Sequence, residues 1–210
     1  MTAATTLTMA DGAGIDLDAV TAADIHAPSI IEQVCKEARY NGATTGLIYF
    51  VGQHLVLGTE AMLRDGATEL EAGCFVVHDW PEGFFKDDPT PKKRTIARRI
   101  ESKCGVTADA FRKVLKEIDD EHEAAVHEAV GLPWPIPEDV KRIVKLYDIK
   151  MFVTEWRDLM GNRPHPDWSP YEGVDPLPET IVPWPWEECR DRLTALAYRL
   201  LPKLRLGERE

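Results

Sequence analysis

Apolar residues recur with the period of an α-helix along most of this 210-residue chain, and this pattern limits the folds available to it. The segment from Pro137 to Met160 is the clearest case, because its apolar positions form one inward stripe. Further helices are expected at Pro28 to Asn41-Gly42, His54 to Leu63, Thr68 to Asp79, Pro91 to Lys103, Thr107 to Val130 and Trp186 to Leu201. The sequence therefore predicts an all-α helical bundle.

Two segments outside these helices have patterns of their own. Residues 5–17 hold two short runs around a glycine turn, which predicts a small N-terminal β-hairpin at one end of the core. Residues 161–186 are rich in proline, glycine and tryptophan, which favours an extended, packed connection over a helix. We expect one domain over residues 1–210, with the hairpin at 5–17, a helical core at 28–160, the connection at 161–186 and a C-terminal helix at 186–201.

Composition restricts the partners and the compartment. A net charge of −11 argues against a surface that binds nucleic acid, because phosphate contacts need clustered lysine and arginine. No apolar run approaches the roughly 20 residues that span a bilayer, and the N-terminus lacks a basic segment followed by an apolar one. The cysteines form no CxxC pair, and we expect most of them to be buried free thiols; they are Cys35, Cys74, Cys104 and Cys189. We therefore expect a cytoplasmic protein that contacts neither membrane nor nucleic acid.

Two histidines and two aspartates interrupt the apolar faces of the expected helices: His54, the adjacent pair His78-Asp79, and Asp148. A polar group held there without a partner costs roughly 2–7 kcal/mol, so a cation is expected to compensate the carboxylates. For Asp148 alone, Lys145 or Lys150 could instead form an ordinary ion pair. The set predicts one divalent metal, and its mixed nitrogen and oxygen donors favour Mn, Co, Fe, Zn or Ni over Mg.

The order H…HD…D on successive helices resembles the HD-domain superfamily of metal-dependent phosphohydrolases. Arg39-Tyr-Asn-Gly42, leading to Val51-Gly-Gln-His54, resembles the Arg-aromatic-x-Gly stretch before the family's first metal histidine. His78-Asp-Trp-Pro-Glu82 resembles its HDxxE motif, and Asp87-Asp-Pro-Thr-Pro91 with Lys93 resembles the D-x-P-T-P-x-K that follows.

The resemblance extends over residues 5–200. Lys145-Leu-Tyr-Asp148 with Thr154-Glu155 is similar to the family's final metal aspartate and the Thr-Glu beyond it. By pattern, the most similar members are bacterial deoxynucleoside 5′-monophosphatases and phage deoxynucleoside triphosphohydrolases, some of them specific for dATP. The chain departs from the pattern at Gly52-Gln53, where Ala-Glu is usual, and at Tyr147, where a small residue is usual. Pro81 is expected to kink or end the helix that carries the HD pair.

The resemblance implies an HD-domain hydrolase of deoxynucleoside monophosphates or triphosphates that uses one metal ion. Glu82 would orient or deprotonate the attacking water, and Asp87 would hold that water or protonate the leaving oxygen. The ordinary alternative for both is a solvated loop carboxylate.

The substrate-binding residues implied in the same way are Arg39, Tyr40, Trp80, Pro91 and Lys93. Arg39 and Lys93 would neutralise phosphate, and the two aromatic rings would stack on the base or sugar. The ordinary alternatives are a cation at a helix end for Arg39, a solvated basic face for Lys93, and core packing for both rings.

Two other functions stay open. An HD-type di-iron oxygenase would need further histidine ligands. His122 and His127 are the only candidates, and both are expected to be exposed on a charged helix. A non-catalytic nucleotide sensor would need a degraded ligand set, whereas all four ligands are present. A homo-oligomer is also open, since apolar positions of 161–186 could cover the core or form a subunit interface.

Overall fold

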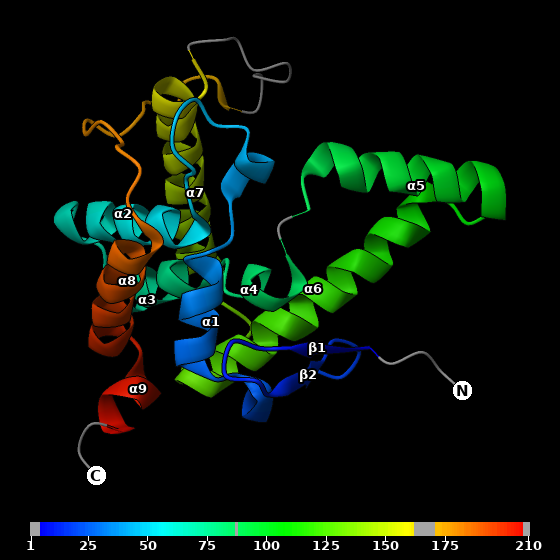
Figure 1. Ribbon diagram of the computed structural model, residues 1–210, viewed down its shortest axis with the longest axis horizontal. Coiled ribbons are helices and arrows are strands. Elements are labelled where there is room, and N and C mark those ends of the chain that lie inside the picture. The colour runs from blue at the N-terminus through cyan, green and yellow to red at the C-terminus, as the bar shows by residue number, and fades with distance from the viewer. Residues whose placement is uncertain (1–4, 87, 162–170, 208–210) are drawn as a thin grey trace.

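The computed structural model describes residues 5–86, 88–161 and 171–207 and consists mainly of helices, with one two-stranded sheet (Figure 1). The all-α fold class with a small hairpin is therefore confirmed. β1 (Thr6–Thr8) pairs antiparallel with β2 (Gly14–Asp16), so that Leu7 lies opposite Ile15. Ile15 is fully buried, which fixes the hairpin to the core.

Helix α2 (Val51–Arg64) lies at the centre of the fold. It packs against α3 (Glu69–Val77), α7 (Glu138–Leu159) and α8 (Trp186–Leu200). A Cβ atom at Gly58 would overlap the ring of Phe75, so glycine is needed where α2 packs against this ring of α3. This contact holds α2, which carries His54, directly against α3, whose C-cap is His78.

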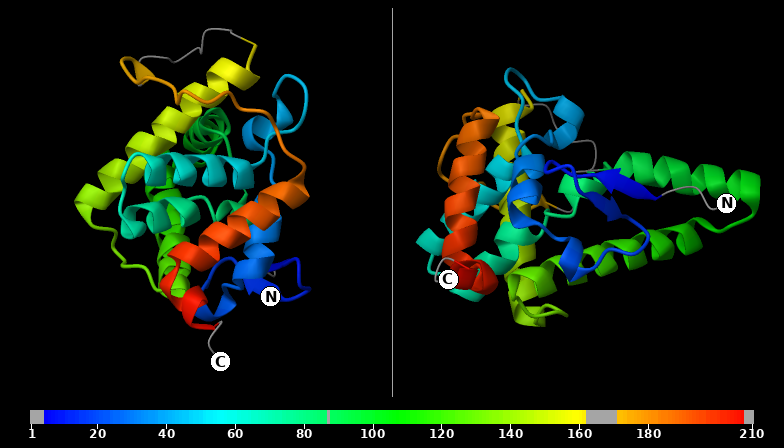
Figure 2. Two further views of the ribbon diagram at one scale, coloured as in Figure 1. Left: turned by 90° about the vertical axis from the view of Figure 1, so that its left-hand side faces the viewer. Right: turned by 60° about the horizontal axis from the view of Figure 1, so that its bottom comes forward.

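Helices α5 (Thr90–Cys104) and α6 (Ala108–Val130) form an arm that extends beyond the rest of the molecule (Figures 1 and 2). Thr107 caps α6, since its hydroxyl accepts the Ala110 N–H at 3.1 Å, and Gly105 ends α5 in the left-handed region. Both helices lie where the sequence predicts them. Ala97 is the only buried residue of α5, so most of this helix is open to solvent.

The first helix is shorter than predicted. α1 (Ala27–Val34) ends eight residues before Gly42, and Arg39–Gly42 forms a separate 3-10 turn, η2. Ala38 pairs with Phe50 in an isolated β-bridge, which an α-helix could not supply. Tyr40 and Asn41 take left-handed conformations at φ 56° and 53°, which also exclude a continuous helix.

Three further elements complete the chain: η1 (Ala22–Asp24), α4 (Glu82–Phe85) and α9 (Pro202–Gly207). Of the predicted connection at 161–186, residues 162–170 lie outside the described part. Residues 171–185 contain no α-helix and are held along α7, where the Leu177 N–H donates to Thr154 Oγ1 at 2.8 Å and the Ile181 N–H donates to Asp158 Oδ2 at 2.8 Å. Over these residues the connection is extended, and only Leu177 and Ile181 are buried.

The residues at which the sequence departs from the HD pattern, Gly52, Gln53 and Tyr147, each make a specific contact in the structure. A Cβ atom at Gly52 would overlap Sγ of Cys35, so an alanine does not fit beside the end of α1. The Gln53 amide donates to Val182 O at 2.8 Å and accepts from the Trp184 N–H at 2.9 Å, and a glutamate could not make the first bond. Tyr147 donates to Asp65 Oδ2 at 2.7 Å.

Three of the four cysteines are buried as free thiols, as expected: Cys35, Cys74 and Cys189. Burial raises the pKa of each of these thiols. Cys104, the last residue of α5, is exposed. None of the helices in the described ranges combines the length and the apolar character required to cross a bilayer.

Candidate metal centre

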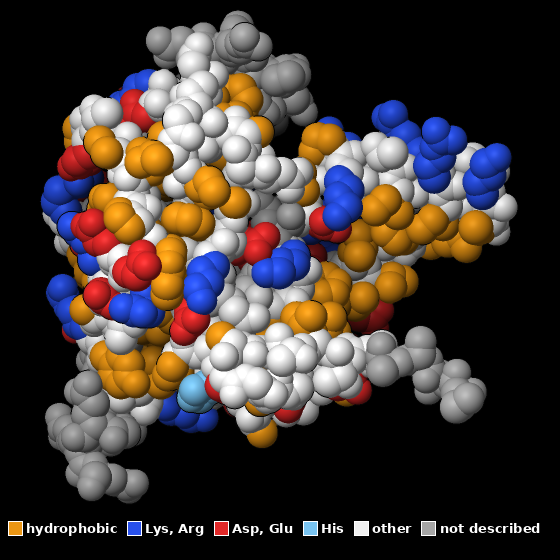
Figure 3. Space-filling view, viewed as in Figure 1, with side chains coloured by type: hydrophobic (Ala, Val, Ile, Leu, Met, Phe, Trp, Pro, Cys, Tyr) orange, Lys and Arg blue, Asp and Glu red, His pale blue; other side chains and the backbone are white. Residues whose placement is uncertain are grey.

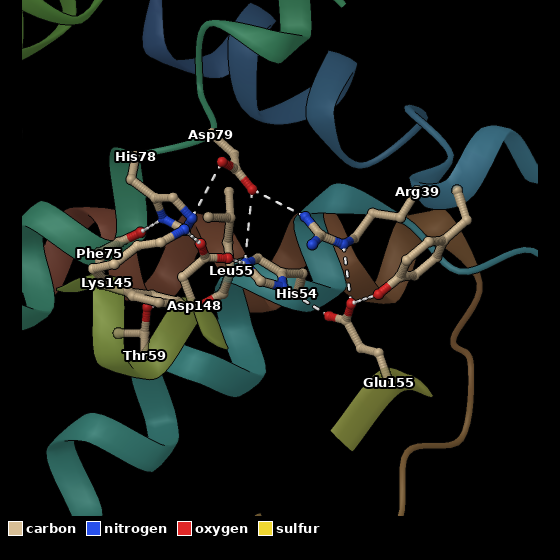
Figure 4. Close-up of polar contacts among 11 residues, drawn as sticks. Arg39, His54, Leu55, Thr59, Phe75, His78, Asp79, Lys145, Asp148 and Glu155 are labelled. Atoms are coloured by element: carbon tan, nitrogen blue, oxygen red, sulfur yellow. Dashed lines mark hydrogen bonds and ion pairs between the residues drawn. The ribbon is translucent and has the colours of Figure 1, made fainter. Parts of the chain in front are cut away.

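The predicted histidines and aspartates converge, although they come from distant parts of the sequence (Figure 4). One ligand atom from each of His54, His78 and Asp148 lies within 4.8 Å of the others. Asp79 Oδ1 lies 3.1 Å from His78 Nε2, and Asp79 Oδ2 lies 3.7 Å from His54 Nε2. His54, His78 and Asp148 therefore surround one small space, and the Asp79 carboxylate lies beside its two histidines.

Both imidazoles are oriented by hydrogen bonds on their Nδ1 atoms. The His78 Nδ1–H donates to the carbonyl of Phe75 at 2.6 Å, and the His54 Nδ1–H donates to Glu155 Oε1 at 2.7 Å. In the neutral imidazole this tautomer leaves a lone pair on Nε2. Both Nε2 atoms are buried without a hydrogen-bond partner in the described part of the chain. A metal ion between them would satisfy both lone pairs, so these residues fit such an ion.

Asp79 does not lie on a helix face, contrary to the sequence prediction. α3 ends at Val77, His78 is its C-cap, and Asp79 lies in the turn before Pro81 and α4. Proline lacks an N–H and cannot continue α3, so the chain turns there. This turn brings the Asp79 carboxylate back over His78.

Asp148 pairs with Lys145, one of the two lysines that the sequence suggested for it, and also lies near His54. Lys145 Nζ donates to its Oδ2 at 2.7 Å, while its Oδ1 lies 3.7 Å from His54 Nε2. Burial alone would raise the pKa of Asp148. The neighbouring His78, His54 and Lys145 outweigh burial and hold the pKa of this carboxyl well below its usual range. Asp148 is therefore an ionised carboxylate with one oxygen directed into the centre.

Glu155 connects the metal centre to η2, and the sequence assigned it no role of its own. It is fully buried, accepts from Arg39 Nε at 3.2 Å and from the Tyr40 hydroxyl, and holds His54 as described above. Burial raises the pKa of Glu155, but the Arg39 guanidinium and the hydrogen bonds from His54 and Tyr40 outweigh it and leave that pKa lowered. Its position seven residues after Asp148, on the same face of α7, was the signal available in the sequence.

Arg39 and Tyr40 do not lie at the end of an α-helix as predicted, since α1 ends before them. Arg39 also donates from Nη1 to Asp79 Oδ2 at 3.1 Å, so its guanidinium links two carboxylates. Burial lowers the pKa of Arg39, but Glu155 and Asp79 outweigh it and hold that pKa well above its usual value. In this arrangement Arg39 orients Asp79 and Glu155.

A cleft of about 430 Å³ opens beside His78 and Asp79. Glu82 and Lys93 line it, and Lys93 has no ion-pair partner among the residues that the structure describes. Pro91 is exposed near the start of α5 and does not line this cleft. Asp87, the other predicted catalytic residue, lies outside the described residues.

Trp80 was predicted to stack on the substrate, but its side chain is fully buried in the core and does not line the cleft. Its position between the short helices α3 and α4 directs it inward, so this prediction is wrong for the structure observed. Tyr40 does not line the cleft either, and its hydroxyl is bound to Glu155.

The opposite wall of the cleft comes from α6, which the sequence indicated to be a charged surface helix. Its lining residues are Phe111, Leu115, Asp119 and Glu123. Burial and the nearby Asp120 raise the pKa of Glu123. Helical spacing of three to four residues places these side chains on one face, which was the signal available in the sequence.

His122 and His127 are buried, not exposed as predicted, at 1% and 2% of their full surface. The His122 Nε2–H donates to the carbonyl of Leu17 at 3.1 Å, and the His127 Nδ1–H donates to that of Pro133 at 2.9 Å. The chain that follows the hairpin and the loop after α6 cover these two faces, which local sequence could not reveal. Neither histidine belongs to the His54, His78 and Asp148 cluster.

No protein-family model matches the chain. It is similar to an uncharacterized protein of Rhodobacter capsulatus, with 34% identity over 156 residues, which cover 73% of this chain and 72% of that protein. This chain therefore belongs to the same protein family as the R. capsulatus protein.

Proposed function

We propose that this protein is an HD-domain phosphohydrolase that acts on deoxynucleoside phosphates. The observation that carries the proposal is the pair of buried Nε2 atoms on His54 and His78, which lack hydrogen-bond partners within the described residues and face two carboxylates. The helical scaffold with its N-terminal hairpin agrees with the fold that the sequence resemblance implies.

His54, His78, Asp79 and Asp148 would hold one divalent transition metal, with Mn, Co, Fe, Zn or Ni as candidates. When bound there, such an ion polarises a phosphoryl oxygen and makes bound water more acidic. Glu155 keeps the His54 Nε2 lone pair directed at the centre through the bond to Nδ1. Arg39 does the same for Asp79.

Three further polar residues would act on substrate and water. Glu82 would accept a proton from the attacking water, and Lys93 would neutralise a phosphate oxygen. Asp87 would hold the water or protonate the leaving oxygen, as the sequence resemblance implies. A nucleotide substrate, a cytoplasmic location and a homo-oligomer remain predictions from sequence.

Turnover assays test this function directly. Protein stripped of metal by a chelator is supplied with Mn, Co, Zn or Mg and given each deoxynucleoside monophosphate and triphosphate. Separation of phosphate, pyrophosphate and tripolyphosphate identifies the bond that is cleaved. We expect turnover that disappears in Asp79→Ala, while Asp109→Ala, on the exposed surface of the arm, leaves it unchanged. Full turnover in Asp79→Ala, or none in the native protein with any of these metals, contradicts the proposal.

The di-iron alternative gains no support from the histidines that it requires. His122 and His127 bond to backbone carbonyls elsewhere in the described structure. Metal analysis that finds two irons per chain would favour that alternative. Tight nucleotide binding without turnover across the metal series would instead favour a sensor.

A further inference from the structure

The cleft beside the metal centre is lined by both polar and apolar side chains. Its polar lining includes His78 and Asp79 of the centre together with Glu82 and Lys93. The side chains Phe85 from α4, Ile96 from α5, and Phe111 and Leu115 from α6 supply an apolar wall. At about 430 Å³ the space lies within the roughly 300–1,000 Å³ range of small-molecule sites, which combine apolar walls with a few polar groups.

We propose that this apolar wall binds the nucleobase of the substrate while the phosphate lies at the metal centre. The inference rests on the proposed function and assigns base binding to α4, α5 and α6. The two rings that the sequence suggested for this task are engaged elsewhere, because Trp80 is fully buried and Tyr40 bonds to Glu155.

Charge within the cleft sets the direction in which a nucleotide enters. Lys93 lies in the first turn of α5 and has no ion pair among the described residues, whereas Lys86 is paired with Glu37 at 2.6 Å. Asp119 and Glu123 line the α6 side. Phosphate would be attracted to Lys93 and to a metal ion held at the centre, so the base would contact the apolar wall.

The apolar wall is held in place before any ligand binds. The ring of Phe85 packs edge-on against His122, with centroids 4.9 Å apart and planes at 77°. His122 is fixed in turn by its bond to Leu17. Ile96 keeps 37% of its surface exposed, which a bound ring could cover. Figure 3 shows hydrophobic side chains along the α5–α6 arm, beneath a row of lysine and arginine side chains. A preformed wall avoids the entropy cost of ordering these side chains on binding.

Binding measurements with separate parts of the substrate test this assignment. Metal-loaded protein is titrated with each deoxynucleoside and, separately, with inorganic phosphate. We expect Phe111→Ala and Leu115→Ala to weaken deoxynucleoside binding by at least about fivefold, since losing one aromatic or apolar contact to a base has effects of this size. Phosphate binding should stay unchanged, as should all binding in Val114→Ala, an exposed α6 residue that does not line the cleft.

Phe111→Leu keeps an apolar side chain and serves where Phe111→Ala fails to fold, as judged by circular dichroism. Unchanged deoxynucleoside binding in Leu115→Ala and in either folded Phe111 variant overturns the assignment. The assignment is also overturned if light scattering shows a changed oligomeric state in a variant whose deoxynucleoside binding is unchanged. The apolar wall would then be a subunit interface. Nucleotide turnover in the native protein separates the two hypotheses. Turnover together with unchanged deoxynucleoside binding in the variants refutes only the assignment of the base to the apolar wall. No turnover with any metal refutes the proposed function.

Discussion

Replacement of Glu155 by alanine should damage the metal centre without removing any of its four predicted ligands. Glu155 is fully buried and accepts hydrogen bonds from His54, Arg39 and Tyr40. In Glu155→Ala the Arg39 guanidinium loses one of its two carboxylate partners, and the His54 imidazole loses the acceptor that fixes its tautomer.

The size of each effect follows from these contacts. Breaking a buried ion pair by removing one partner costs about 3–5 kcal/mol, because the remaining charge stays desolvated. At about 2–4 °C per kcal/mol for a chain of this size, the Tm should fall by about 6–20 °C. Loss of the partner that orients a metal-binding histidine weakens metal affinity by about 10–100-fold.

Calorimetry separates the two effects. Scanning calorimetry in a chelator gives the Tm of the metal-free protein, and titration with Zn or Mn against a competing chelator gives the metal affinity. Glu155→Gln is the matched control, since its amide oxygen can still accept the His54 Nδ1–H although the charge is lost. It should lose stability but keep more metal affinity than Glu155→Ala. Metal affinity in Glu155→Ala within about twofold of the native value would refute the positioning role.

Three other substitutions test separate parts of the structure. Gln53→Glu should lower the free energy of unfolding by about 1–3 kcal/mol in urea titrations, because a buried carboxylate cannot donate to Val182 O; an unchanged midpoint contradicts this. Gly52→Ala should cost about 1–3 kcal/mol through its clash with Cys35, and native stability would show that α1 can shift. Burial lowers the pKa of His127 in the folded protein below its ordinary value of 6.5. At a pH between these two values the unfolded chain binds more protons than the folded protein, so the free energy of unfolding should fall as the pH drops below 6.5. His127→Asn keeps a donor for Pro133 O but cannot titrate. Between about pH 7.5 and 5.5 its Tm should fall less than the Tm of the native protein, and an equal fall would contradict this role of His127.

Elements governed by local pattern were predictable from the sequence. α2, α5, α6 and α7 lie within two or three residues of their predicted ends, since their apolar stripes and the Thr107 cap act over a single helix. The end of α1 was not predictable in this way. It depends on the bridge between Ala38 and Phe50 and on two left-handed residues, neither of them glycine.

In the candidate site, too, some features could be predicted from local sequence and others depend on the tertiary structure. The convergence of His54, His78 and Asp148 could be expected, because polar side chains on apolar faces need a common partner, whereas the place of Asp79 depends on the turn before Pro81. The roles of Glu155 and Glu123 depend on which side chains face them across the fold. The burial of His122 by the chain around Leu17 likewise required the tertiary structure.

The uneven exposure of the thiols makes this protein suitable for site-selective labelling without mutagenesis. Cys35, Cys74 and Cys189 are enclosed and held as protonated thiols, whereas Cys104 is open to solvent at the junction of α5 and α6. A maleimide dye added to the native protein should therefore attach at one place, the tip of the arm. Its fluorescence anisotropy would report whether that tip tumbles with the rest of the molecule or swings independently.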